Sequence, residues 1–166
     1  MTDAGEPSDL QPRRLRDAFG CFSTGVTVVS AYGPGGAAVG LTANSFTSVS
    51  LDPPLVLFCL DRRSRRAPAF EAAPAFAVNV LHAGQEGVSK HFARGGTDDE
   101  GASFIEWSGT PVLADAMAVF ACRRHAVHDG GDHLVLIGRV ERVRSDPRQD
   151  PLLYFQGRYR SVHVPE

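Results

Sequence analysis

Short apolar runs separated by polar turns make up most of the chain, and few of them have the spacing of a helix. Strand-like runs cover Val26 to Tyr32, Leu55 to Leu60 and Phe76 to Leu81, each six or seven residues long. That length and the abundance of Val, Leu and Phe are typical of buried strands. The pattern therefore predicts a mainly β or α+β barrel and not a doubly wound parallel sheet.

The second half of the chain contains the clearest local signal. Two long strand-like runs, Met117 to His128 and His133 to Arg144, are joined by Asp129-Gly130-Gly131-Asp132. Gly next to Asp allows the backbone a tight turn, so this segment predicts a β-hairpin. A final strand is expected over Leu152 to Phe155.

Two short segments have helical spacing. The first begins near Pro12 and places Leu15, Phe19 and Phe22 at positions that lie on one face. The second runs from Gln85 to Arg94. Short helices flanking a barrel are therefore expected.

Length and charge limit the possible classes. With 166 residues, 43% of them hydrophobic, the chain fits one domain over residues 12–166, preceded by a polar and mobile tail at 1–11. A net charge of −2 provides no general attraction to nucleic acid or to anionic membranes. No apolar run approaches the roughly 20 residues that cross a bilayer. The start lacks the apolar region of a signal peptide, so a cytoplasmic protein is expected.

The cysteines and histidines do not predict a metal site. Cys21, Cys59 and Cys122 lie in apolar patterns and are expected to be small buried side chains in a reducing compartment. Cys122, His125 and His128 have suggestive spacing, but on a strand His125 points away from the other two. Three ligands would not converge there.

The most unusual stretch is the segment from Gly40 to Pro54, which we call the polar ribbon. It carries hydroxyl, amide and carboxylate side chains where a strand would alternate with apolar ones, and it ends at Pro53-Pro54. Such groups suit a flat heterocycle with donors and acceptors, although an edge strand protected against aggregation has a similar composition. The cluster Arg62 to Arg66 is either a solvated loop or, with Ser64, a phosphate clamp.

Several separated motifs resemble the flavin reductase-like family of the FMN-binding split-barrel superfamily, in particular the reductase components of two-component flavin-dependent monooxygenases. The motifs are Phe22 to Ser30, Gly40 to Pro54, Phe76 to Leu81, Gly131-Asp132-His133 and Pro151 to Phe155. The resemblance implies a six-stranded Greek-key split barrel that forms a homodimer with one flavin per subunit near the interface. It also implies an enzyme that uses NADH or NADPH to reduce FMN or FAD, and that supplies reduced flavin to a partner monooxygenase.

The same resemblance implies roles for individual residues. The isoalloxazine ring would lie along Thr42, Ala43, Asn44 and Ser45. The ribityl chain and its surroundings would meet Ser48, Val49, Ser50, Cys59, Leu60 and Asp61. The phosphate would be approached by Ser64, Ser89, His91 and Arg94, with Phe92 in the same cofactor-binding set. His133 would act beside the nicotinamide as the catalytic residue, and Tyr159 would close that side.

The sequence departs from the family at Asp99 to Phe104. Relatives often carry an acidic-aromatic pair with a basic residue there, and only Phe104 clearly matches. A flavin-binding electron carrier and a pyridoxamine-phosphate-oxidase-like oxidase of the same fold remain open alternatives, as does a structural subunit of an oxygenase complex. Two apolar tracts, Val26 to Val29 and Val135 to Ile137, are expected to be exposed and to favour the homodimer.

Overall fold

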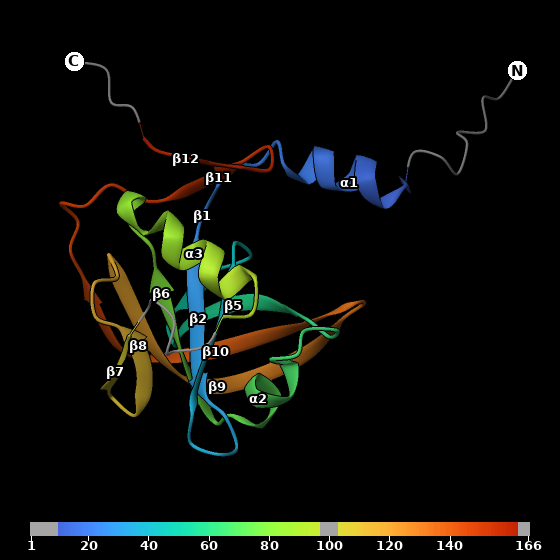
Figure 1. Ribbon diagram of the computed structural model, residues 1–166. Helices are drawn as coiled ribbons and strands as arrows, with labels where there is room; N and C mark the ends of the chain where they lie inside the picture. The colour runs from blue at the N-terminus through green and yellow to red at the C-terminus, as the bar shows by residue number, and fades with distance from the viewer. Residues whose placement is uncertain (1–9, 97–102, 163–166) are drawn as a thin grey trace, which may run out of the picture.

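The largest sheet is antiparallel, and its strands lie in the order β3 (Ala38–Ala43), β2 (Thr27–Tyr32), β6 (Ala75–Val80), β9 (Ala118–Gly130), β10 (His133–Ser145), β5 (Pro54–Asp61) and β4 (Thr47–Leu51). The computed structural model describes residues 10–96 and 103–162 (Figure 1). The predicted hairpin is confirmed, because β9 and β10 pair along their whole length around Gly131 and Asp132. The predicted strands at 26–32, 55–60 and 76–81 are confirmed as β2, β5 and β6.

The polar ribbon forces this sheet to curl into a split barrel. Its two halves are β3 and β4, which are the two edge strands of the sheet. Only residues 44–46 separate them in the chain, and such a connection spans at most about 14 Å between the flanking Cα atoms. The two edges must therefore face one another, which confirms the expected split-barrel fold. The sheet contains seven strands, one more than expected, because the ribbon is divided into two of them.

Aromatic and branched side chains fill the inside of the curled sheet. Phe58 contacts Phe70 and Phe76 edge-to-face, with ring centroids 5.9 and 5.2 Å apart. Phe70 comes from α2 (Ala67–Ala72), a helix that the sequence did not predict. Each of these buried rings contributes about 1.5–3 kcal/mol through its removal from water. The core thus holds both the sheet and the loop that follows β5.

Smaller elements surround the barrel. Helix α1 (Pro12–Phe19) projects from it beside β1 (Thr24–Gly25), β11 (Leu153–Phe155) and β12 (Arg158–Arg160), which form a three-stranded sheet (Figure 1). Helix α3 (Glu86–Ala93) follows a 3₁₀ turn, η2 (Ala83–Gln85), and strands β7 (Phe104–Trp107) and β8 (Thr110–Leu113) form a separate hairpin. The two predicted helices are confirmed as α1 and α3.

The apolar face of α1 is not buried within this chain. Phe19, the last residue of α1, has 70% of its surface exposed, and Phe22, which was expected on the same helical face but follows the helix, has 78% exposed. The tract from Val26 to Val29 is in contrast buried, since β2 lies inside the sheet between β3 and β6, so the expectation that it is exposed was wrong. Val135 and Ile137 are half-buried in β10.

The cysteines differ from one another. Cys122 is buried as expected, but Cys59 is half-buried and Cys21 is exposed, because Cys21 follows the projecting helix α1 and not a strand of the barrel. The expectation that all three are buried was therefore wrong for Cys21 and only partly right for Cys59. Among the described residues, no helix is long and apolar enough to cross a membrane.

Candidate functional site

A cavity of about 760 Å³ opens where the ends of β3, β5 and α3 meet. Its volume lies in the range of small-molecule and cofactor sites. Its lining residues come from four separate parts of the chain: Leu41, Thr42, Ala43, Asn44 and Ser45; Cys59, Leu60, Asp61, Ser64, Arg65 and Arg66; Phe92, Ala93, Arg94 and Gly95; and His133. Most of the residues expected in the site are therefore brought together.

The polar ribbon forms one wall, and two of its hydroxyl groups hold that wall in place. Thr42 Oγ1 donates to the carbonyl of Ser89 at 2.6 Å. Ser45 Oγ accepts from the amide of Cys59 at 2.9 Å and lies 3.3 Å from the Cys59 carbonyl. Asn44, between them, is exposed. Small side chains that are tied back in this way leave the backbone and the Asn44 amide accessible to a flat ligand.

Another part of the cavity lining is cationic. Arg65, Arg66 and Arg94 line it together with Ser64. Arg66 Nη2 donates to the carbonyls of Gly95 and Gly96 at 2.8 and 2.9 Å, so the loop after β5 is tied to the end of α3. Guanidinium groups form charge-assisted hydrogen bonds with phosphate oxygens. The chemistry of this end suits a phosphate monoester.

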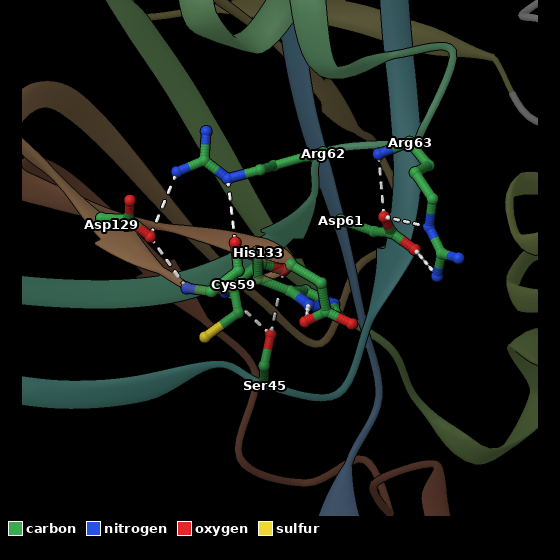
Figure 2. Close-up of polar contacts among 9 residues, drawn as sticks. Ser45, Cys59, Asp61, Arg62, Arg63, Asp129 and His133 are labelled. Carbon is green, nitrogen blue, oxygen red and sulfur yellow. Dashed lines mark hydrogen bonds and ion pairs between the residues drawn. The ribbon is translucent and has the colours of Figure 1, made fainter. Parts of the chain in front are cut away.

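The arginine cluster thus has two parts. Arg62 reaches the β9–β10 hairpin, where it bonds to the Gly131 carbonyl and lies 3.3 Å from Asp129, while Arg63 turns to Asp61 (Figure 2). These two arginines are bound to carboxylates and do not line the cavity. The sequence identified the cluster but could not show that only Arg65 and Arg66 face the ligand space.

His133 stands at the rim of the cavity, beside Asp132 and Asp61, and the turn next to it also carries Asp129. Its Nδ1 atom lies 2.7 Å from Asp132 Oδ1, and it pairs across the strands with Asp61. Hydrogen bonds from Arg63 hold the pKa of Asp61 below its usual value, and the hydrogen bond from His133 does the same for the pKa of Asp132. The amide of Gly131 and the charge of Arg62 lower the pKa of Asp129. All three carboxylates are therefore ionised at neutral pH.

Other expected residues lie outside this cavity. Ser48, Val49 and Ser50 are on the edge strand β4, where Ser48 and Val49 are exposed and Ser50 is half-buried. Ser89 is fully buried. Its hydroxyl lies 2.8 Å from that of Tyr159.

A neighbouring cavity of about 260 Å³ contains Ser89 and Tyr159, along with Thr42 and Asn44 of the polar ribbon. A third cavity of about 730 Å³ lies between α1 and the β11–β12 hairpin, and Asn44 also contributes to its wall. Asn44 therefore lines all three of these cavities. Tyr159, expected to close the nicotinamide side, lines the cavity of about 260 Å³ and not the main one.

Aromatic side chains pack against one another near α3, and Phe92 among them also lines the main cavity. Phe92 stacks on Phe104 with ring centroids 5.2 Å apart, and a side chain at Gly40 would collide with both rings. His91 lies against Gly96 and contacts the Phe92 ring edge-to-face. Of the segment in which the sequence departs from the family, Asp99 to Phe104, residues 99–102 lie outside the described residues, and Phe104 packs against Phe92.

The flavin reductase like domain model matches residues 19–163. The chain is 49% identical over 135 residues to a probable flavin reductase of Rhizobium meliloti, covering 79% of this chain but only 43% of that longer protein. It is 42% identical over 151 residues to the reductase component of 4-hydroxyphenylacetate 3-monooxygenase of Thermus thermophilus, covering 91% of this chain and 97% of that one.

A solved structure has the same fold. The NADH:FAD oxidoreductase SgcE6 of Streptomyces globisporus C-1027, determined in complex with NAD and FAD fragments, superposes with a TM-score of 0.87 at 40% identity over 97% of this chain and 96% of that chain. Sequence and fold agree over nearly the whole length. The chain belongs to the flavin reductase like domain family.

Proposed function

We propose that this chain is an NAD(P)H-dependent flavin reductase, which transfers hydride from NADH or NADPH to FMN or FAD. The observation that carries the proposal is the main cavity, in which a polar ribbon, a cationic end and His133 meet around one space of about 760 Å³. The hydroxyl and guanidinium donors that line the cavity fit a flavin phosphate. The solved relative that holds NAD and FAD fragments supports a nicotinamide nucleotide and a flavin as the two ligands.

Within this proposal, the polar ribbon and the end of β5 contact the ring system through Thr42 to Ser45 and Cys59 to Asp61. Ser64, Arg65, Arg66 and Arg94 bind the phosphate. A flavin held there would accept a hydride from the reduced nicotinamide. The chain itself orients the two molecules, since alignment of the reacting atoms lowers the barrier by several kcal/mol, on the order of that seen in well-oriented intramolecular reactions.

His133 is the proposed catalytic residue because it is the imidazole at the rim of the cavity. We expect His133→Ala to lower kcat/KM for NAD(P)H by about 10- to 100-fold, which corresponds to about 1.4–2.7 kcal/mol. The flavin Kd should change little, because the ribbon and the arginines stay intact. Stopped-flow flavin reduction at the parental rate in a folded variant would remove His133 from the site.

The partner proposed for the reduced flavin is a monooxygenase in the cytoplasm. The Thermus relative, named the reductase component of a monooxygenase, supports this, since the chain covers nearly all of that protein. Co-purification is not required, because reduced flavin can diffuse between the two proteins. Oxygenation of a monooxygenase substrate in a mixture with this chain, NADH and flavin would support the transfer.

A homodimer is also proposed, on the exposed apolar side chains Leu10, Phe19, Phe22 and Leu51. Phe19 and Phe22 line one cavity together, and exposed apolar side chains that are grouped in this way often mark an interface. Sedimentation should show that the parent is a dimer. A variant with both Phe19→Glu and Phe22→Glu should dissociate to monomers at higher protein concentration than the parent does. A monomeric parent would contradict this part of the proposal.

The decisive experiment measures NADH and NADPH oxidation with FMN and FAD, in all four combinations. A reductase consumes nucleotide at a rate that depends on added flavin. An electron carrier binds flavin and leaves the nucleotide unoxidised. An oxidase of the pyridoxamine phosphate type produces peroxide in proportion to an added amine without NAD(P)H. Flavin binding with no nucleotide oxidation in any combination would overturn the proposed function.

A further inference from the structure

The turn of the β9–β10 hairpin places a carboxylate against the histidine at the rim of the main cavity. Asp132 Oδ1 lies 2.7 Å from Nδ1 of His133, and Nε2 has no hydrogen-bond partner among the described residues. An ionised carboxylate only accepts hydrogen bonds, so Nδ1 must carry the proton in this contact. A neutral imidazole has a single N–H, and its Nε2 is then a hydrogen-bond acceptor.

The position of Asp132 is fixed by the backbone around it. Gly131 has a φ of +78°, which a residue with a side chain rarely adopts. Its amide donates to Asp129 Oδ1 at 2.9 Å, and its carbonyl accepts from Arg62 Nε at 3.1 Å. The amide of Arg62 donates to the Asp132 carbonyl at 3.1 Å. The loop after β5 therefore holds the turn in place, and this fixes the backbone that positions the Asp132 carboxylate beside the His133 ring.

Other charges near the imidazole are already engaged. Asp61, the strand partner of His133, accepts from both the backbone and the side chain of Arg63. Arg62 is bound to Asp129 and to the turn. Asp132 is consequently the carboxylate that contacts the ring directly. Both members of the pair remain partly in water, with side chains 73% and 39% exposed for Asp132 and His133, so the energy of the contact is modest and its main effect is on which nitrogen carries the proton.

We propose that Asp132 is a positioning residue that holds neutral His133 as the Nδ1–H tautomer, so that Nε2 accepts the carboxamide N–H of the nicotinamide. The assignment of nicotinamide as the ligand rests on the proposed function, whereas the assignment of the tautomer does not. In the absence of Asp132 the ring is free to carry its proton on Nε2, which would then oppose an N–H donor with another donor. The main cavity would still bind flavin, but His133 would no longer favour a nucleotide that carries a carboxamide.

The first test observes the tautomer without any ligand. Long-range ¹H–¹⁵N spectra of the full-length labelled protein at about pH 8, above the usual histidine pKa, report which nitrogen of each of the six histidines is protonated. His133 is assigned by its loss in His133→Gln. We expect Nδ1–H in the parent and a shift towards Nε2–H in Asp132→Ala. An unchanged tautomer in Asp132→Ala would overturn the proposal.

The matched control is Asp115→Ala. Asp115 Oδ2 also contacts a histidine, His82 Nε2, at 3.1 Å, and neither residue lines the main cavity. This variant removes the same charge from another exposed pair and should leave the His133 signals in place. A change at His133 in this control would show that net charge, and not the contact, sets the tautomer.

The second test compares NADH with its 3-acetylpyridine analogue, in which a methyl ketone replaces the carboxamide and no N–H donor is present. The ratio of kcat/KM values for the two should fall by about 2- to 12-fold from the parent to Asp132→Ala, the equivalent of one neutral hydrogen bond. Asp132→Glu should restore part of it. An equal loss with both nucleotides would contradict the proposed role. If the parent oxidises neither nucleotide with flavin, the proposed function fails, while the tautomer measurement still decides the role of Asp132.

Discussion

The hydroxyl of Ser45 occupies the place of a strand partner for Cys59. Strand β4 pairs with β5 only from Leu51 to Thr47, and Thr47 faces Leu57. Two residues further along β5, the amide of Cys59 donates to Ser45 Oγ at 2.9 Å. A side chain thus extends the β4–β5 pairing across the gap where the two edges of the curled sheet face one another, and it lies at the wall of the main cavity.

Ser45 should therefore contribute to stability as well as to the site. Ser45→Ala leaves the Cys59 amide without its partner, and we expect the free energy of unfolding to fall by about 1–3 kcal/mol. Urea denaturation measures the change. The control is Thr47→Ala, whose exposed hydroxyl bonds only to the neighbouring Ser48 carbonyl at 3.3 Å, and which should cost less than about 0.5 kcal/mol. Equal stability of the two variants would show that the Ser45 hydroxyl does not hold the edges together.

The contact between Ser89 and Tyr159 should behave as a coupled pair. Tyr159→Phe removes the partner of a fully buried hydroxyl, and the expected loss is about 1–2 kcal/mol of unfolding free energy. Ser89→Ala together with Tyr159→Phe should cost less than the sum of the single changes, with a coupling of about 0.5–1.5 kcal/mol. Tyr154→Phe is the control, since its ring packs on Tyr159 at 5.4 Å. Additive effects would rule out the pairing.

Arg65 should distinguish flavins by their phosphate. It lines the cavity and is exposed, so its guanidinium is accessible to a ligand. We expect Arg65→Ala to raise the Kd of FMN by about 10-fold, the equivalent of one charge-assisted hydrogen bond, and to leave the Kd of riboflavin unchanged. Quenching of flavin fluorescence measures both. Arg62→Ala removes an arginine of the same loop that is bound to Asp129 and does not line the cavity, and it should affect neither ligand. A parallel loss of riboflavin affinity would argue against a phosphate contact.

The three cysteines should be alkylated in a set order. Burial raises the pKa of the Cys122 thiol to about 12, so at about pH 8 almost none of it is the reactive thiolate. Exposed Cys21 should react first, Cys59 in the cavity wall more slowly, and Cys122 only on unfolding. Pulses of iodoacetamide followed by peptide mass spectrometry give the rates.

Saturating FMN should protect Cys59 and leave Cys21 unchanged, which makes Cys21 an internal control. The protection needs no turnover and so reports on the site alone. Reaction of Cys59 at the same rate with and without FMN would place the flavin elsewhere.

The sequence alone determined the strands of the barrel, its long hairpin and the family. Buried strands such as β5 and β6 have a local signature, because their apolar side chains must leave water whatever their neighbours are. The Asp129–Asp132 turn is equally local, since tight turns demand particular residues at particular positions. Helix α2 and the hairpin of β7 and β8 carry weaker local patterns and were not predicted; packing against the barrel stabilises them.

Only the tertiary structure decided how the polar ribbon is used. Thr42 to Ser45 and Ser48 to Ser50 are alike in composition, yet the first group lines the cavity and the second lies on an exposed edge. The division arises at the short connection between β3 and β4, which are the two edge strands of the curled sheet. The arginines from Arg62 to Arg66 are divided in the same way, since Arg62 bonds to the β9–β10 hairpin and Arg66 to Gly95, just after α3. Local spacing can indicate which residue types are suited to a site, but the curling of the sheet decides which of them line the same cavity.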